Sequence, residues 1–114
     1  MRVRLLVLLT LLITLVLVAS PTASARVRLV SVTSPASPGG HATLTASVSP
    51  SRTCSITVNY KSGPSHAQGL NPKRAIQGRV SWTWMVGTRT TPGRWGIVLS
   101  CGSAGTLRTS FVVR

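Results

Sequence analysis

The stretch HATLTASVSPSRTCSITVNY, residues 41 to 60, decides the fold. Apolar side chains occupy every second position on both sides of a Ser49-Pro50-Ser51 break, and mostly small polar residues fill the positions between them. The alternating set is Ala42, Leu44, Ala46 and Val48 before the break, then Cys54, Ile56, Val58 and Tyr60 after it. A period of two residues is typical of a half-buried strand, because successive side chains point to opposite faces. These residues therefore predict two β-strands joined by a turn.

The same period continues toward the carboxyl end of the chain. Alternating apolar side chains run through residues 80–86, 95–101 and 107–113, and turns rich in Gly, Pro and Ser separate the runs. No segment of the expected domain shows the 3.6-residue period of an amphipathic helix. Six strong strands and one weak strand are expected. Their number and spacing predict an all-β, antiparallel two-sheet sandwich of immunoglobulin-like type.

Two segments depart from the regular alternation. In the first strand the apolar parity changes between Leu29 and Val30, which predicts a β-bulge. The longest connection, residues 61–79, is expected to contain one short edge strand around Arg74 to Gln77, since prolines lie on its approaches.

The two cysteines, Cys54 and Cys101, both fall on the inward parity of their strands. A shift of one residue in either strand would place a sulfur on the solvent face, so this agreement supports both the register and a disulfide. A bridge that closes the loop from Cys54 to Cys101 contributes about 4 kcal/mol to the free energy of unfolding, because it restricts the unfolded chain. The alternative is a pair of free thiols, which an oxidising compartment disfavours.

The amino terminus has the features of a secretory signal. Two arginines precede an apolar run at residues 5–18, and Ala23-Ser24-Ala25 fits a small-residue cleavage site. The alternative, an uncleaved membrane anchor, would need about 20 apolar residues. We expect a signal peptide at residues 1–25 and one secreted domain at residues 26–114, which is a monomer without a transmembrane span after cleavage.

Part of the expected domain resembles a known family. The resemblance spans residues 53 to 101, and its more specific pieces are TCSITV at 53–58, YKSGPS at 60–65, VSWTW at 80–84 and TTPGRW at 90–95. These pieces are similar to small immunoglobulin-like modules of bacterial secreted and cell-surface proteins. The resemblance implies a β-sandwich with a cysteine bridge between neighbouring strands, used as an accessory or interaction module without catalytic residues. The chain departs from the family in charge, because such modules usually hold some acidic residues.

The charge balance excludes most catalytic machinery. The 114 residues include 13 Lys and Arg but no Asp or Glu, so the formal net charge is +13. Without a carboxylate side chain there can be no glycosidase pair, no Ser-His-Asp triad and no oxygen cage for calcium. We therefore expect a protein that is not an enzyme and that uses no cofactor.

The histidines have structural explanations. His66 follows Ser65, but no acid is present to orient its imidazole, so nucleophilic catalysis is not expected. His41 has outward parity at the start of a strand, where it is expected to be solvated. The two histidines and two cysteines lack the short spacings of a metal site, so no metal is expected either.

The tryptophans are expected in the core. Trp82 and Trp84 share one strand face and Trp95 has inward parity, so we expect all three to pack around the disulfide. The alternative is a platform on which sugars or bases stack, and it would require these rings to be exposed to solvent.

The basic residues are the main functional signal. With no acidic partner in the chain, the arginines are free to bind external anions, and the guanidinium fork suits phosphate and carboxylate groups. The anion-binding residues are expected to be Lys61, Lys73, Arg74, Arg79, Arg89 and Arg94. A second group on the outward parity of the terminal strands is expected to form a stripe: Arg26, Arg28, Arg108 and Arg114. The competing explanation is that the charge only keeps the protein soluble.

These observations predict a secreted or cell-wall-associated binding or adhesion module. The expected partners are anionic polymers of the cell envelope. Two alternatives remain open: an extracellular nucleic-acid binder, whose affinity would fall steeply with salt, and a structural accessory subunit that docks on an acidic protein.

Overall fold

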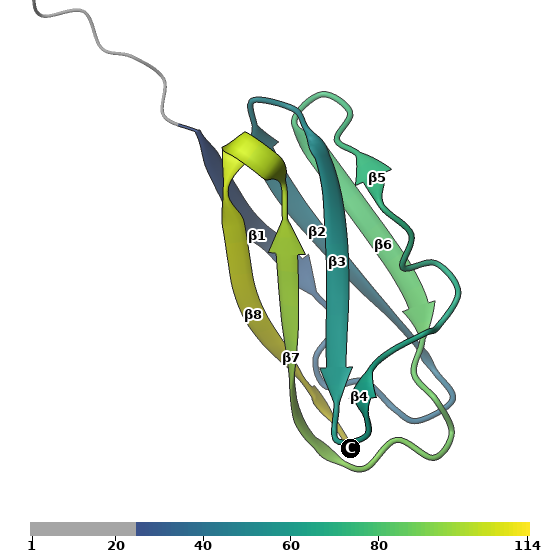
Figure 1. Ribbon diagram of the computed structural model, residues 1–114. Helices are drawn as coiled ribbons and strands as arrows, with labels where there is room; N and C mark the ends of the chain where they lie inside the picture. Colours follow the sequence, from purple (N-terminus) through teal and green to yellow (C-terminus); the bar gives the residue numbers. More distant parts are fainter. Residues whose placement is uncertain (1–24) are drawn as a thin grey trace, which may run out of the picture.

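The computed structural model describes residues 25–114, which form eight strands and one short helical turn (Figure 1). The elements in chain order are β1 (Arg26–Val32), β2 (His41–Ser49), β3 (Thr53–Tyr60), β4 (Gly63–Pro64), β5 (Lys73–Arg74), β6 (Arg79–Met85), β7 (Gly93–Ser100), the 3-10 turn η1 (Gly102–Ala104) and β8 (Thr106–Val113). The expected signal peptide lies outside the described residues apart from Ala25.

The strands form two antiparallel sheets packed face to face, which confirms the predicted sandwich (Figure 1). The first sheet has the order β1-β2-β6, and the second has the order β4-β3-β7-β8 with β5 paired to the start of β3. The six long strands are divided as in an immunoglobulin-like sandwich. Constant-type immunoglobulin domains have a fourth long strand at the edge of the first sheet. In this protein the corresponding segment is the short β5, which pairs with β3 of the second sheet instead.

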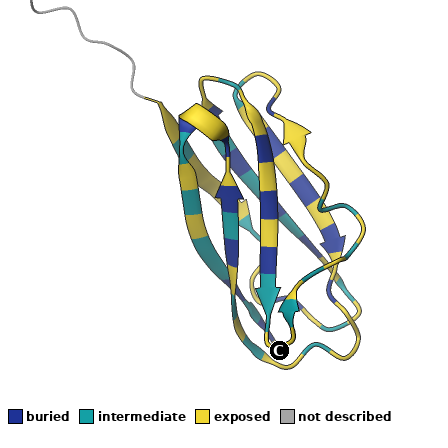
Figure 2. Ribbon diagram, in the orientation of Figure 1, coloured by how far each residue is buried: buried dark blue, intermediate teal, exposed yellow. Residues whose placement is uncertain are grey.

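The alternation seen in the sequence places the core between the sheets. Figure 2 shows buried and exposed positions alternating along β3 and β6. The largest fully buried side chains come from both sheets and include Leu44, Trp82, Trp84, Leu99 and Phe111. Burial of this apolar surface is the main force that holds the two sheets together.

The predicted β-bulge is present in β1. The pairing of β1 with β2 shifts between Leu29 and Ser31, where the apolar parity changes. The extra residue keeps Val27 and Val32 over the same sheet face, opposite Val48 and Leu44.

The weak edge strand lies earlier than predicted. β5 consists of Lys73–Arg74, whereas the expected strand runs from Arg74 to Gln77. Gln77 and Gly78 both have positive φ, at 51° and 76°, so the chain turns back toward β6 at these residues. Two successive residues with positive φ form a type I′ turn and cannot continue a strand.

The disulfide is formed as predicted. Cys54 on β3 and Cys101, directly after β7, are bonded at an S–S distance of 2.07 Å and are both fully buried. β3 and β7 are hydrogen-bonded neighbours in the second sheet. The bridge therefore lies within one sheet, between neighbouring strands.

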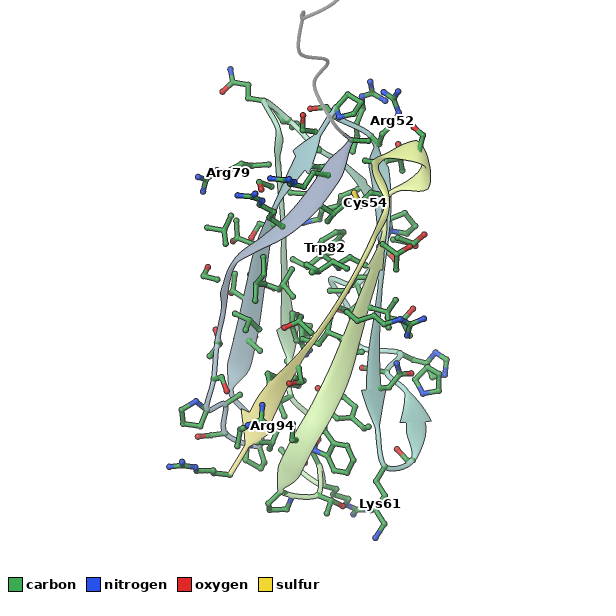
Figure 3. All side chains as sticks on the ribbon, turned by 90° about the vertical axis from the view of Figure 1, so that its left-hand side faces the viewer. Arg52, Cys54, Lys61, Arg79, Trp82 and Arg94 are labelled. Carbon is green, nitrogen blue, oxygen red and sulfur yellow. A yellow bond between two sulfur atoms is a disulfide. The ribbon has the colours of Figure 1, made fainter. Side chains whose placement is uncertain are left out.

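Trp82 and Trp84 on β6 lie in the core, and Figure 3 shows Trp82 between the sheets. The Trp82 indole donates to the backbone carbonyl of Asn71 at 2.8 Å, and the Trp84 indole donates to the hydroxyl of Tyr60 at 3.2 Å. A buried indole N–H needs such a partner, because an unpaired polar group in the core costs free energy. These two rings do not form an exposed stacking platform.

Trp95 lies at the margin of the core, which corrects the prediction that it packs fully inside. Its indole lies against Gly93 and donates to the backbone carbonyl of Thr91 at 2.8 Å. Because Trp95 stands near the start of β7, at an end of the sandwich, the opposite sheet covers the ring only in part. Inward parity therefore gives the direction of this side chain but not its depth.

Candidate functional site

The basic side chains gather at the two ends of the sandwich. One end, called the basic end below, carries the turn between β2 and β3, the hairpin between β5 and β6, and η1. Its basic residues are Arg26, Arg28, Arg52, Lys73, Arg74, Arg79 and, on the outer face of the second sheet, Arg108. The opposite end carries Lys61, Arg89, Arg94 and Arg114. Figure 3 shows this separation, with Arg52 and Arg79 toward one end and Lys61 and Arg94 toward the other.

The six predicted anion-binding residues therefore do not form one patch. Lys73, Arg74 and Arg79 lie at the basic end, whereas the other three lie at the opposite end. Lys61 and Arg89 line the same small depression there. Lys61 is separated from Lys73, Arg74 and Arg79 because the long connection runs along the sandwich, from the end of β3 back to the start of β6. Arg89 and Arg94 lie at the opposite end because the chain passes there from β6 to β7.

A row of cross-strand partners carries the densest charge of the first sheet. Arg28 on β1 is opposite Ser47 on β2, and Ser47 is opposite Arg79 on β6. Arg79 also pairs with Ile76 across the tight turn. Directly opposite residues share a sheet face, and neighbouring strands lie about 4.8 Å apart, so the row spans about 14 Å. These four residues, Arg28, Ser47, Arg79 and Ile76, are called the outer row below.

The expected stripe along the terminal strands is not formed. Arg28 lies on the outer face of the first sheet, but Arg108 pairs with Val98 on the outer face of the second sheet. Arg114 follows β8 and lies at the far end from Arg26. Outward parity on β1 and β8 points to opposite faces of the molecule, because the two strands belong to different sheets.

Lys73 is partly engaged in the fold. Its Nζ donates to the backbone carbonyl of Ser81 at 2.9 Å, so the side chain reaches from β5 to the edge of the other sheet. β6 is an edge strand of the first sheet. The lysine occupies a backbone carbonyl of this edge that could otherwise pair with a strand of another chain. Lys73 therefore has a structural contact as well as a charge.

Arg52 belongs to the basic end, although sequence reasoning did not select it. Its Nε donates to the hydroxyl of Ser103 at 3.0 Å, and its Nη1 donates to the carbonyl of Ser51 at 3.1 Å. Its own carbonyl accepts a hydrogen bond from Ala75 N at 2.9 Å, which brings the turn between β2 and β3 beside the hairpin. The sequence did contain a feature that could have identified Arg52, namely its position in the turn between two strongly predicted strands.

The electrostatics of the basic end favour an external anion. Seven cations lie there, and the sequence contains no Asp or Glu that could pair with them. Every one of the seven is exposed. Like charges held close together repel one another, and a bound anion relieves that repulsion as well as forming direct hydrogen bonds.

A groove of about 760 Å³ opens at the opposite end. Its lining includes Tyr60, Trp84, Met85 and both histidines, His41 and His66, which are exposed. Burial raises the pKa of Tyr60, and the hydrogen bond from Trp84 partly offsets this effect. The phenol therefore stays protonated at neutral pH, and neither imidazole has a carboxylate partner to activate it as a base.

One wall of this groove depends on Gly69. A Cβ on Gly69 would overlap the backbone carbonyl oxygen of Thr83, and the residue has a positive φ of 93°. Only glycine allows the segment after β4 to lie this close to the edge of β6.

Within residues 25–114, no group of three or more His, Cys, Asp or Glu side chains is placed to hold a metal ion. In the same part of the chain, no helix has the length and apolar character needed to cross a membrane.

Comparison with known proteins assigns no family: no protein-family model matches the chain, and no curated protein matches it either. The resemblance to bacterial immunoglobulin-like modules therefore stays a prediction.

Proposed function

We propose that this protein is a non-enzymatic binding module that attaches, outside the cytoplasm, to anionic polymers of the cell envelope through its basic end. The observation that carries the proposal is the gathering of seven cations without an acidic side-chain partner at one end of the sandwich. Within that group, Arg28 and Arg79 lie on one flat sheet face, two strands apart.

The sheet face that extends from the outer row also suits a polar polymer. Cross-strand hydroxyls cover it, with Thr43 Oγ1 and Thr83 Oγ1 2.8 Å apart and Thr45 Oγ1 and Ser81 Oγ 3.1 Å apart. Serine and threonine hydroxyls both donate and accept hydrogen bonds, and they commonly contact phosphate and sugar oxygens. A polymer running along the strands would meet arginines first and hydroxyls next.

Guanidinium groups give this surface its preference for phosphate and carboxylate. Arginine stays charged at any physiological pH and offers a planar fork of donors. Six of the seven cations at the basic end are arginines. Binding through such pairs weakens with salt, because the cations are exposed to solvent.

The test compares two variants with the same loss of charge. The oxidised domain, residues 26–114, would be bound to isolated cell envelope, to an acidic glycan and to duplex DNA across a salt series. We expect Arg28→Ser/Arg79→Ser to lower the affinity for envelope at least tenfold, at about fivefold for each guanidinium–phosphate contact. The matched control, Arg89→Ser/Arg114→Ser at the opposite end, should lower it less than threefold.

Three results would contradict the proposal. Equal losses in both double variants would mean that net charge alone causes retention. Release from every polymer near 0.15 M salt, where the Debye length is about 8 Å, would mean that the charge is not a recognition device. Stronger retention on DNA than on envelope would assign the surface to nucleic acid instead. In that case the logarithm of the affinity should fall with the logarithm of the salt concentration, with a slope of about 0.9 for each phosphate neutralised.

A further inference from the structure

The hairpin at the basic end holds an isoleucine out in the solvent. Ile76 is 75% exposed, more than any other large apolar side chain in residues 25–114, whereas the preceding Ala75 is 3% exposed. The chain therefore buries a small residue at this hairpin and leaves a large one in water, against the usual preference.

The hairpin is held in place by its own backbone and by the neighbouring strands. Ile76 N donates to Arg79 O at 2.8 Å, and Arg79 N donates to Ile76 O at 3.0 Å. Gly78 is tied down as well, because its carbonyl accepts from Val48 N at 2.8 Å and its N–H donates to Ser51 Oγ at 3.1 Å. These bonds prevent Ile76 from folding back onto the core without breaking the turn.

Cations surround this apolar side chain. Ile76 and Arg79 are directly opposite across the turn, so their side chains share a face, and Arg28 lies in the same outer row. Arg74 is two residues before Ile76, whereas Arg26 starts β1, which is separated from β6 by β2. Figure 1 shows the hairpin at the same end of the sandwich as η1 and the turn between β2 and β3.

We infer that the basic end docks on the surface of an anionic lipid bilayer, with Ile76 inserted at the boundary between headgroups and acyl chains and Arg28 and Arg79 on lipid phosphates. This inference rests on the proposed function, since it uses the same cations, and it names a partner. A soluble polymer has no apolar phase to receive an isoleucine, whereas the boundary between headgroups and acyl chains does. Anionic lipids also attract basic side chains near the surface.

The experiment measures flotation of the oxidised domain, residues 26–114, with lipid vesicles. This part contains every strand of the described residues, together with the core and the disulfide. Vesicles of equal parts phosphatidylglycerol and phosphatidylcholine would be compared with vesicles of phosphatidylcholine alone, and an acidic glycan would serve as the soluble polymer. We expect the domain to bind the anionic vesicles and not the neutral ones.

The decisive variant is Ile76→Ser. It should weaken vesicle binding about fivefold, because it removes the inserted apolar group, and change glycan binding less than twofold. Met85→Ser is the matched control, because Met85 is 51% exposed on the same strand face at the opposite end of β6. It should change neither affinity. Ile76→Trp should strengthen vesicle binding and give an emission that shifts to the blue on binding, since tryptophan favours the membrane interface.

The outcomes separate the two proposals. If Ile76→Ser leaves vesicle binding unchanged and Ile76→Trp emission does not shift, the lipid inference is overturned while polymer binding through the arginines still stands. If Arg28→Ser/Arg79→Ser leaves both the vesicle and the glycan affinities unchanged, both proposals fall. Equal binding to neutral and anionic vesicles would also overturn the inference, because the arginines would then have no role.

Discussion

The two ends of the sandwich are stabilised by different means. At the basic end the Cys54–Cys101 disulfide and the tight hairpin hold the chain in place. At the opposite end an aromatic cluster does so, with Tyr60 edge-on to Trp95 and Phe111 at centroid distances of 6.4 and 6.0 Å. Such aromatic pairs contribute about 1 kcal/mol each beyond their buried area.

This difference follows from the charge at the basic end and the groove at the opposite end. Seven like charges repel one another at the basic end, and side chains that must stay hydrated cannot supply much apolar burial. Covalent and backbone constraints can hold that end without covering its surface. The opposite end has a groove, and rings can line it and stabilise it at the same time. Variants at each end can break or sharpen this comparison.

The largest effect is expected from removing the disulfide. The Cys54→Ser/Cys101→Ser variant should lose about 4 kcal/mol of unfolding free energy, because the unfolded chain regains the freedom of a long loop. Urea denaturation followed by tryptophan fluorescence measures the loss. A loss below about 1 kcal/mol would show that the basic end does not depend on its covalent link.

Gly69→Ala should destabilise the protein by about 2 kcal/mol. The new methyl group would overlap the carbonyl of Thr83, and the backbone would have to keep a positive φ that alanine disfavours. Gly96→Ala is the control, since a Cβ at Gly96 meets nothing within 4 Å, and its unfolding free energy should stay within about 0.5 kcal/mol of the parent. Similar losses in the two variants would argue against the close approach.

Tyr60→Phe should cost about 1 kcal/mol at neutral pH. The change leaves the indole N–H of Trp84 without its acceptor while keeping the ring in the aromatic cluster. Thermal unfolding measures the loss, and the emission of Trp84 should change with it. Phe111→Leu is the comparison that perturbs the aromatic packing without touching this hydrogen bond.

The same tyrosine predicts a pH dependence. Burial raises its pKa above the ordinary value of 10.0, so above that pH the unfolded state loses the phenol proton while the folded state keeps it. Stability should therefore be unaffected by this group below pH 10 and fall as the pH rises beyond it. Tyr60 is the only tyrosine, so Tyr60→Phe should show a smaller alkaline loss than the parent protein. Identical alkaline curves would contradict this.

The smallest effect is expected in the hairpin. Gln77 adopts a φ of 51° in the type I′ turn, and asparagine tolerates this conformation better than glutamine. Gln77→Asn should raise the unfolding free energy by about 0.5 kcal/mol, whereas Gln77→Ala should not raise it. Destabilisation by Gln77→Asn would mean that the glutamine side chain contributes something that the turn geometry does not explain.

Much of the fold followed from local pattern. The alternation through residues 41–60 predicted β2 and β3, and the parity change in β1 predicted the bulge. The inward parity of both cysteines predicted the bridge. These features depend on neighbours one or two positions away, which is the range over which a strand imposes its period.

The predictions were wrong where they depended on how deeply a side chain is buried or on how the strands are arranged. Trp95 has the parity of a core residue, but its position near the end of the sandwich leaves it half covered. The expected edge strand through Gln77 became a turn, and the two-residue β4 was not predicted. The candidate site was divided for the same reason, because basic residues close in the sequence lie at opposite ends.

The sequence by itself determined the sign of the charge, the absence of carboxylate chemistry, the strand period and the cysteine pair. Only the tertiary structure decided that Arg28, Arg79 and Ile76 lie in one row. The first two residues are 51 positions apart in the printed sequence, and their proximity depends on β2 lying between β1 and β6. Strand order is set by how all the apolar faces are buried together, and no local pattern encodes it.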